Sequence, residues 1–511
     1  MTTASDAGGG HIAAAGVGMP SSPGGESIRG IVTAVIDRTR SAADVVADRV
    51  DRCQKAHGRL NALIQQRFAV AAEEARRVDD WPCGPLAGVP VSVKECFPVR
   101  GMHTTLGLLG RRESRDESDA EIVARLREVG AVVLGKGNVP QALYLHETDN
   151  PVWGRTNHPL VTDRGPGGSS GGDAALVAAG AVPLAVGNDL AGSIRQPANA
   201  CGIVGLVPRA ATLGRGGAVE TMPRIVGQRS RAGILTRTVA DAAAGFDALC
   251  GGGVTAAPAS RTWRVGWWDD TGLLEPSPAV RRAVAVAVGR LRCAGATVER
   301  VDADIATEAA WIHLGLVSAD GGNDIRRLLA GERPIAQVRH LLRLAGLPAW
   351  TRALLAGACA WSGRRIEGIA LRRTGPRRAA GLAHLLKERD GMSTVIDRWM
   401  TSYDCLVCPV SALPALRHGT AARLVLAAAP CLLANLLDLA AGAVPVTTVG
   451  AGEESGRARS RDPVEREAQD TDRGSAGLPV GVQVITLERR PREAERLLLE
   501  VMRVVEGPSG A

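Results

Sequence analysis

The chain has 511 residues, 45% of them hydrophobic, which is enough for a sizeable core, and its 3% of aromatic residues predicts that this core is aliphatic. A net charge of +8 is compatible with an anionic surface without requiring one. The chain shows no clustered DNA-reading motif and no basic-then-apolar leader, so we expect neither nucleic-acid binding nor secretion.

The N-terminal part of the chain divides by composition. Residues 1–27 are rich in Gly, Ala, Ser and Pro without periodicity and are expected to form a disordered tail. Across 28–80, apolar residues recur at helical spacing between charges, which predicts an N-terminal helical segment. In the main body, 81–505, helix-like runs such as Ala120–Val129 alternate with strand-like runs such as Ala131–Leu134. This alternation predicts an α/β fold with helices layered on a central sheet.

Lys94 is the first candidate for chemistry. It ends an alternation of valines from Val89 to Val93, which predicts the end of a buried strand. The chain has only four lysines, whereas arginine is abundant. Because a desolvated amine can lose its proton and a guanidinium cannot, a lysine in an apolar strand is a candidate base. The alternative is a lysine that snorkels to water from the strand end.

The segment Gly130–Gly137 nearly matches a phosphate-binding loop. Gly137 occupies the position of the hydroxyl residue that would hold Mg²⁺, and an apolar strand lies where the phosphate loop should be. Nucleotide binding is therefore not expected.

The segment Gly165–Pro197 carries two glycine-rich serine turns, which flank a small-residue helical run and a short apolar run. We name Gly167–Gly172 the serine turn. It satisfies G-x-S-x-G twice, but a nucleophile elbow needs a hydrophobic strand before it, and the preceding residues are polar and include Pro166. A flexible loop without chemistry is the second interpretation. The third pairs these serines with a basic partner elsewhere, for which Lys94 qualifies.

Further along the chain, 325–378 interleaves leucines and tryptophans with arginines. This pattern favours a helical insertion that rests on a membrane surface, or a soluble helical pair on the body or in a dimer interface. The apolar run Leu424–Val446 is interrupted by polar residues and is predicted to be core. The charged segment Gly450–Gly474 is predicted to be an exposed loop. Ten cysteines without an extracellular signal fit a reducing compartment. Cys405 and Cys408 have C-x-x-C spacing, but they lie in a strand-like run, where a redox turn is not expected, and no second pair completes a zinc site.

These motifs, taken together, resemble the amidase signature family, and within it the fatty acid amide hydrolases, over roughly 81–501. The resemblance rests on VPVSVKECF (89–97), TTLGL (104–108), NVPQ (138–141), PGGSSGG (166–172), GSIR (192–195), CGIVGL (201–206), AGAVPVTTV (441–449) and GLPVGVQ (477–483). It implies the family's fold, a central twisted mixed β-sheet covered by helices on both faces, with 325–378 as an insertion in the catalytic domain.

The resemblance also implies roles for single residues. Ser193 matches the nucleophile, Ser169 the bridging serine and Lys94 the base, so that a Ser-Ser-Lys triad is expected. The backbone N–H groups of the oxyanion turn, defined as Leu190, Ala191, Gly192 and Ser193, are expected to stabilise the tetrahedral oxyanion.

Other residues are expected to support the triad. Ser170 matches a serine that holds the lysine, and Asp189 and Arg195 are expected to pair and fix the turn. Leu143 and Tyr144 match a segment that lines the acyl channel, with an ordinary core position as the alternative for Tyr144. The chain departs from the family where Asn188 replaces the usual threonine. A second departure, Ala191 in place of glycine, costs on the order of 1 kcal/mol if that position needs a positive φ.

The resulting expectation is a serine amidase that hydrolyses acyl amides, with long-chain fatty amides as the preferred substrates, and that needs no metal or other cofactor. A cytoplasmic protein is expected, with contact to the inner face of a membrane through 325–378 as one alternative, and the relatives suggest a homodimer. Two other functions stay open. One is an amidotransferase subunit that passes ammonia to a charged-tRNA partner. The other is an inactive amidase-like binding protein, for which a complete triad would be unnecessary.

Overall fold

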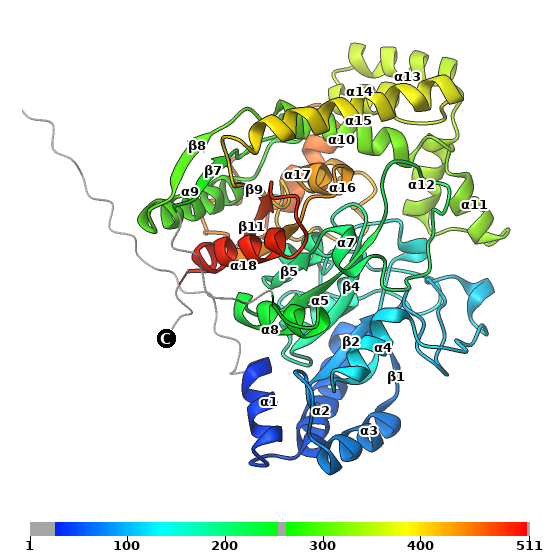
Figure 1. Cartoon of the computed structure of the whole chain (residues 1–511). Helices are drawn as coiled ribbons and strands as arrows, with labels where there is room; N and C mark the ends of the chain where they lie inside the picture. Colours follow the sequence, from blue (N-terminus) through cyan, green and yellow to red (C-terminus); the bar gives the residue numbers. More distant parts are fainter. Residues whose placement is uncertain (1–25, 254–261, 508–511) are drawn as a thin grey trace, which may run out of the picture.

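The computed structural model describes residues 26–253 and 262–507, so most of the predicted tail lies outside the described residues. The described strands are β1 (Leu63–Gln66), β2 (Pro90–Lys94), β3 (Val132–Gly137), β4 (Leu184–Asp189), β5 (Val204–Val207), β6 (Arg231–Thr236), β7 (Arg264–Trp267), β8 (Thr297–Arg300), β9 (Cys405–Pro409), β10 (Ala441–Thr448) and β11 (Pro479–Thr486). Together these described strands form one mixed 11-stranded sheet in the order β1-β3-β2-β4-β6-β5-β10-β11-β9-β7-β8 (Figure 1).

Parallel pairing joins β2 to both β3 and β4, and β7 to both β8 and β9. The other neighbours run antiparallel. Every residue of β2, β3, β4, β6, β9 and β11 is buried. Because successive side chains of a strand point to opposite faces, helices must cover both faces of the sheet. The predicted fold class is therefore confirmed.

The helices are α1 (Ile28–Ile36), α2 (Ala42–Leu60), α3 (Phe68–Asp80), α4 (Glu121–Glu128), α5 (Gly171–Ala178), α6 (Arg195–Cys201), α7 (Ala210–Leu213), α8 (Val239–Leu249), α9 (Pro278–Cys293), α10 (Asp304–Val317), α11 (Asn323–Leu329), α12 (Ala336–Ala345), α13 (Ala349–Trp361), α14 (Arg365–Arg373), α15 (Ala379–Trp399), α16 (Leu432–Leu436), α17 (Pro463–Asp472) and α18 (Glu493–Glu506). Short 3₁₀ turns form η1 (Leu109–Arg111), η2 (Gln141–Leu143) and η3 (Val425–Cys431).

The N-terminal segment 28–80 contains the expected helices and also a strand that we did not predict. Helix α2 begins at Ser41, whose hydroxyl accepts a hydrogen bond from the Asp44 N–H, and it ends at Asn61 in the left-handed conformation. The next strand, β1, pairs antiparallel with β3. The segment therefore supplies an edge of the central sheet rather than only packing on it.

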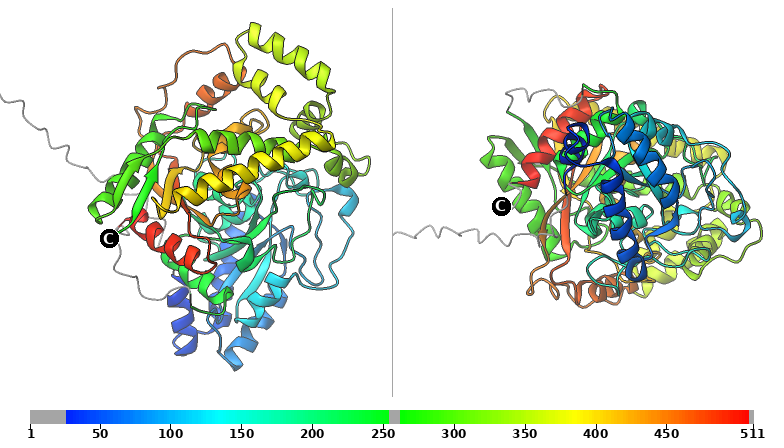
Figure 2. Two further views of the ribbon diagram at one scale, coloured as in Figure 1. Left: turned by 45° about the horizontal axis from the view of Figure 1, so that its top comes forward. Right: turned by 90° about the horizontal axis from the view of Figure 1, so that it is seen from below.

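Helices α11 to α14 form most of the predicted insertion 325–378. Of these, α13 and α14 lie at the opposite end of the molecule from α1–α3 in Figure 1 and in the left view of Figure 2, whereas α11 and α12 lie nearer its middle. None of the described helices is both long and apolar enough to cross a membrane. The interrupted apolar run Leu424–Val446 is core, as predicted, because it forms η3, α16 and β10 and is mostly buried.

One prediction for the C-terminal part was wrong. Gly450–Gly474 is not an exposed loop throughout, because it contains helix α17. Asp462 caps this helix by accepting from the Val464 N–H, and Pro463 occupies its first position, where no N–H is needed. Val464 and Ala468 face the interior. The segment differs from the predicted loop because its apolar residues recur at helical spacing among the charges, so that part of it folds as a helix.

Candidate active site

Lys94 is the last residue of β2 and is completely buried. Its Nζ lies 2.6 Å from the Ser169 Oγ, 2.6 Å from the Asn188 Oδ1 and 3.2 Å from the Asn188 backbone oxygen. Burial lowers the pKa of Lys94 to about 8, although nearby negative charges, including those of Asp173 and Asp189, act in the opposite direction. The neutral amine is therefore a minor form near pH 7 and the major form above about pH 8.

The neutral amine fits its three partners. It has two N–H bonds and one lone pair, and Asn188 offers two oxygens that only accept. If both N–H groups donate to Asn188, the lone pair of Lys94 is left to accept the proton of Ser169. The arrangement thus directs the basic electron pair at a serine hydroxyl.

The serine turn is held by close backbone contacts. Gly167 has a φ of +79°, which favours glycine. A Cβ on Gly168 would lie 2.8 Å from the backbone between Leu145 and Glu147, and one on Gly172 would lie 2.1 Å from the backbone nitrogen of Asn138. These glycines are needed because the turn lies directly against other backbone segments. Ser169, between them, is only 2% exposed.

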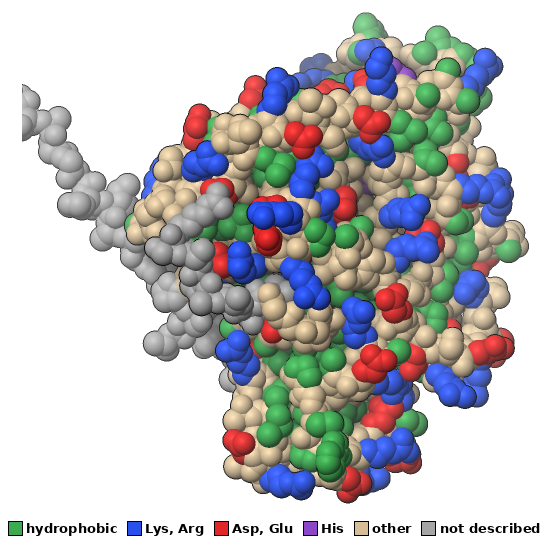
Figure 3. All heavy atoms as spheres, in the orientation of Figure 1, with side chains coloured by type: hydrophobic (Ala, Val, Ile, Leu, Met, Phe, Trp, Pro, Cys, Tyr) green, Lys and Arg blue, Asp and Glu red, His purple; other side chains and the backbone are tan. Residues whose placement is uncertain are grey.

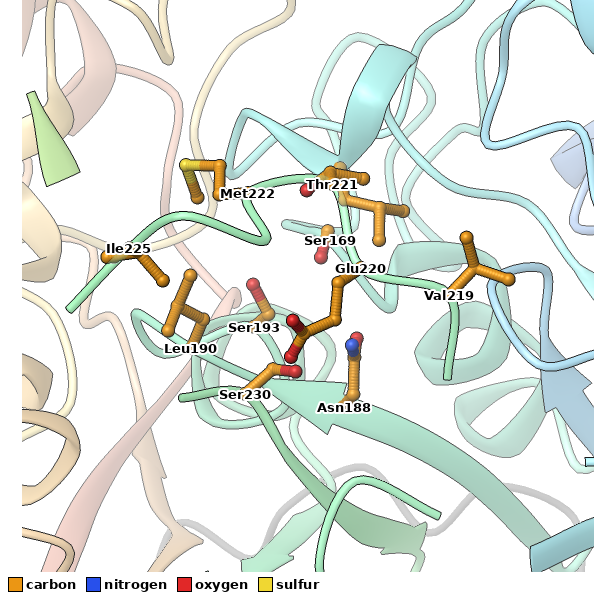
Figure 4. Close-up of a pocket in the computed structure, with 11 residues that line it drawn as sticks. Ser169, Asn188, Leu190, Ser193, Val219, Glu220, Thr221, Met222, Ile225 and Ser230 are labelled. Carbon is orange, nitrogen blue, oxygen red and sulfur yellow. The ribbon is translucent and has the colours of Figure 1, made fainter. Parts of the chain in front are cut away.

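Ser193 and Ser169 line one pocket with about 450 Å³ of empty space, part of it open to solvent. The residues that line the pocket are Leu143, Ser169, Asn188, Leu190, Ser193, Val219, Glu220, Thr221, Met222, Ile225 and Ser230 (Figure 4). The Ser170 N–H donates to the Ser193 backbone oxygen at 3.1 Å, which joins the two turns. Within the described residues no hydrogen bond links the Ser169 and Ser193 hydroxyls, although both face this pocket.

Asp189 and Arg195 pair as predicted, with 3.0 Å between Nη2 and Oδ1, and both are completely buried. Arg195 holds the pKa of the Asp189 carboxyl far below its usual range, against the effect of burial. Asp189 also accepts hydrogen bonds from the backbone N–H groups of Gly192 and Ile194, at 2.7 and 3.0 Å. One carboxylate thus fixes the turn that carries Ser193.

The conformation of the oxyanion turn removes one expected difficulty. Gly192 takes the positive φ, +96°, whereas Ala191 is not among the described residues with positive φ. The alanine therefore carries no penalty of the kind considered above. The Gly192 N–H is already bonded to Asp189, so it is not available as an oxyanion donor. No acceptor is recorded within the described structure for the N–H groups of Leu190, Ala191 and Ser193.

His146 fixes the same turn from its other side. Its Nε2 lies 2.9 Å from the Ala191 backbone oxygen, and because a carbonyl only accepts, that nitrogen must carry the proton. Burial lowers the pKa of His146, which keeps the ring neutral. The Ala191–Gly192 peptide group is therefore held at both ends, by His146 at its oxygen and by Asp189 at its nitrogen.

Two expected contacts are absent. The Ser170 hydroxyl is buried and has no hydrogen-bond partner within the described residues, so it does not hold Lys94. Its oxygen instead packs against Gly187 of β4, where a Cβ would lie 2.7 Å from it.

Leu143 lines the pocket as expected, but Tyr144 does not. Leu143 has a φ of +56°, and the chain turns so that Tyr144 packs against the core.

Several site residues lacked a predicted role. Asn188 contacts Lys94, His146 contacts the backbone of Ala191, and the pocket is also lined by Val219, Glu220, Thr221, Met222, Ile225 and Ser230. Asn188 was noticed only because it departs from the family pattern. Cys405 and Cys408 lie inside β9, both buried, and burial raises the pKa of both thiols, which agrees with a structural role for the C-x-x-C pair. The described residues contain no group of three or more metal-ligating side chains.

Comparisons with known proteins identify the family of the chain. A family model described as Amidase matches residues 44–494. Fatty-acid amide hydrolase 1 of Sus scrofa is 33% identical over 444 residues, which cover 83% of this chain and 76% of the relative. A glutamyl-tRNA(Gln) amidotransferase subunit of Thermobifida fusca is 38% identical over 223 residues, only 43% of this chain and 44% of the relative. A solved structure of fatty acid amide hydrolase has a TM-score of 0.80 at 20% identity and covers 94% of this chain and 85% of that one. The chain belongs to the amidase signature family and is an amide-hydrolysing enzyme.

Proposed function

We propose that this enzyme hydrolyses fatty acid amides through an acyl-enzyme on Ser193, with Ser169 as the bridging group and Lys94 as the base. The observation that carries the proposal is the 2.6 Å contact between the buried Lys94 amine and Ser169, in the pocket that also holds Ser193. A serine hydroxyl is a weak nucleophile until a base removes its proton, and this contact supplies the base.

In the proposed mechanism, neutral Lys94 takes the Ser169 proton while Ser169 takes that of Ser193. The Ser193 oxygen then bonds to the amide carbon, and the carbonyl electron pair moves to its oxygen. The N–H groups of Leu190, Ala191 and Ser193 are the donors proposed to stabilise this oxyanion.

As the intermediate collapses, its C–N bond breaks and the proton returns from Lys94 through Ser169 to the leaving nitrogen. Water then bonds to the carbonyl carbon of the acyl-enzyme while its proton passes to the base, and the bond from that carbon to the Ser193 oxygen breaks as the proton returns to this oxygen. The products are a carboxylic acid and an amine or ammonia, and the three side chains regain their starting protonation states.

The fatty acyl preference rests on apolar surfaces. Five aliphatic or thioether side chains line the pocket: Leu143, Leu190, Val219, Met222 and Ile225.

On α13, Trp350 is 69%, Leu354 67% and Trp361 92% exposed. Their spacing puts these three on one side of the helix. Apolar and basic side chains are visible at this end of the molecule (Figure 3). Such a surface is suited to the interface of a membrane that delivers lipid amides.

A fluorophosphonate probe with a long alkyl chain, followed by mass spectrometry of the modified peptide, tests the proposal. We expect the label on Ser193, protection by oleamide but not by acetamide, and no label on the Ser193→Ala variant. Labelling that acetamide and oleamide block equally would contradict the lipid preference. A well-folded protein that takes no label would contradict the nucleophile and favour an inactive binding protein.

The role of an ammonia-supplying subunit is disfavoured, because the match to the amidotransferase subunit covers less than half of this chain and less than half of that relative. Release of ammonia from glutamine at a rate above that from oleamide would reverse this preference.

A further inference from the structure

Glu220 introduces a negative charge into a pocket otherwise lined by uncharged side chains. Among the described residues that line the pocket, it is the only acidic or basic one. Its side chain is 22% exposed, and its carboxylate points into the pocket between Ser193, Ser230 and Asn188 (Figure 4). The proposed mechanism assigns it no step.

The segment that carries Glu220 is fixed on both sides of it. The Val219 N–H donates to the Cys96 backbone oxygen at 2.9 Å, and the Arg224 N–H donates to Asp324 at 3.0 Å. The carboxylate forms an ion pair at 2.8 Å with Arg215, whose side chain is half exposed. The segment is therefore held in position, and the ion pair places a half-exposed arginine on the solvent side of Glu220.

A carboxylate at this position has a cost for ordinary amide hydrolysis. The tetrahedral intermediate on Ser193 is negatively charged, and a nearby negative charge raises its energy. A cationic group on the substrate would offset this cost, and an anionic group would increase it. The apolar lining suits the acyl part, which leaves the polar side with Ser230 and Glu220 to the amine part.

We propose that Glu220 is a specificity-determining residue that selects acyl amides whose amine part carries a protonated nitrogen and disfavours those whose amine part carries a carboxylate. This inference rests on the proposed function, because it takes Ser193 as the nucleophile. It adds the chemical class of the amine part, which the family assignment leaves open.

Three probes of matched acyl length test it at pH 7.5: N-(2-aminoethyl)octanamide, N-propyloctanamide and N-octanoyl-β-alanine. The readout is kcat/KM for release of octanoate. We expect the wild-type enzyme to favour the cationic over the anionic probe by tenfold or more, roughly the effect of one close charge. Glu220→Gln should lower this ratio by a similar factor.

Arg215→Gln is the matched control, because it breaks the same ion pair but keeps the carboxylate. If Glu220 acts through its charge, this variant raises the cationic-to-anionic ratio, whereas Glu220→Gln lowers it. Equal changes in both variants, or an unchanged ratio in Glu220→Gln, would overturn the inference.

Ser193→Ala separates this failure from failure of the proposed function. Loss of octanoate release from every probe in this variant supports the nucleophile whatever the ratios are. Retained release overturns the proposed function and the inference with it. Calorimetry with Ser193→Ala measures the affinity for the same probes without turnover. We expect the affinity to fall in the order cationic, neutral, anionic, and the reverse order would overturn the inference.

Discussion

Replacing Asn188 with alanine should move the pH dependence of amide hydrolysis to lower pH. The side-chain oxygen of Asn188 accepts a 2.6 Å hydrogen bond from Lys94, whose pKa is about 8. Because the bond is stronger to the ammonium than to the amine, it raises the pKa of Lys94 above the value that burial alone would produce.

The size of the shift follows from the strength of such a bond. A hydrogen bond to a charged group contributes about 1.5–3 kcal/mol. One pKa unit corresponds to about 1.4 kcal/mol, so the pKa of Lys94 should fall by about one to two units. The backbone oxygen of Asn188 still accepts at 3.2 Å in the variant, which favours the lower end of that range.

The assay is kcat/KM for a short soluble amide between pH 5.5 and 10 at constant ionic strength. In the wild-type enzyme the rate should rise with pH through about 8 and become flat above it, because only neutral Lys94 accepts a proton. In Asn188→Ala the rise should lie about one unit lower. The plateau should also fall by roughly tenfold or more, because the lone pair is less well directed at Ser169.

Asn157→Ala is the control, since the side-chain amide of Asn157 donates to the Arg59 backbone oxygen and, within the described structure, does not line the pocket. It should leave the profile unchanged. A folded Asn188→Ala enzyme whose profile rises at the wild-type pH, or at higher pH, would refute the assignment of Asn188 and of the neutral Lys94 base.

Three further predictions concern the turn and the insertion. His146→Ala should lower kcat by roughly tenfold or more with little change in KM, because the oxyanion turn loses one of its two fixed ends, and steady-state kinetics on a soluble amide check this. Asp189→Asn should cost about 3–5 kcal/mol of unfolding free energy in urea, since Arg195 is left buried without its counter-charge, and a loss below about 1 kcal/mol would contradict that reasoning. Replacing Trp350 and Trp361 together with serine should weaken sedimentation with anionic liposomes while sparing turnover of a short soluble amide, and equal liposome binding would remove the membrane contact.

Local patterns were sufficient for much of the fold. The valines before Lys94 predicted a buried strand, and β2 is buried throughout. The small residues after the serine turn predicted a helix, and α5 begins at Gly171. Both depend on neighbours a few positions away, so a single sequence reveals them. The helix α17 had comparable signals, with Asp462 and Pro463 at its start, but the surrounding charges obscured them.

The contacts within the site could not be derived in the same way. Asn188 lies 94 positions after Lys94, and their contact depends on the pairing of β4 with β2, which no local pattern encodes. His146 reaches Ala191 across 45 positions from an irregular segment. The residues of the proposed triad were identified from motifs, whereas the contacts of Lys94 follow from the order of the strands in the sheet.

In the proposed mechanism, the parallel pairing of β2 and β4 makes catalysis depend on strand register. Val93 pairs with Val186, and each strand ends one to three residues later, with Lys94 on one and Asn188 and Asp189 on the other. A slip of one residue would turn Lys94 to the opposite face of the sheet, away from the serine turn. During refolding, a misaligned sheet would still contain these strands yet have no Lys94 amine beside Ser169. The recovered amidase activity would therefore report only the correctly registered molecules. Spectroscopic measurements of sheet content would report the correctly registered and the misaligned molecules together.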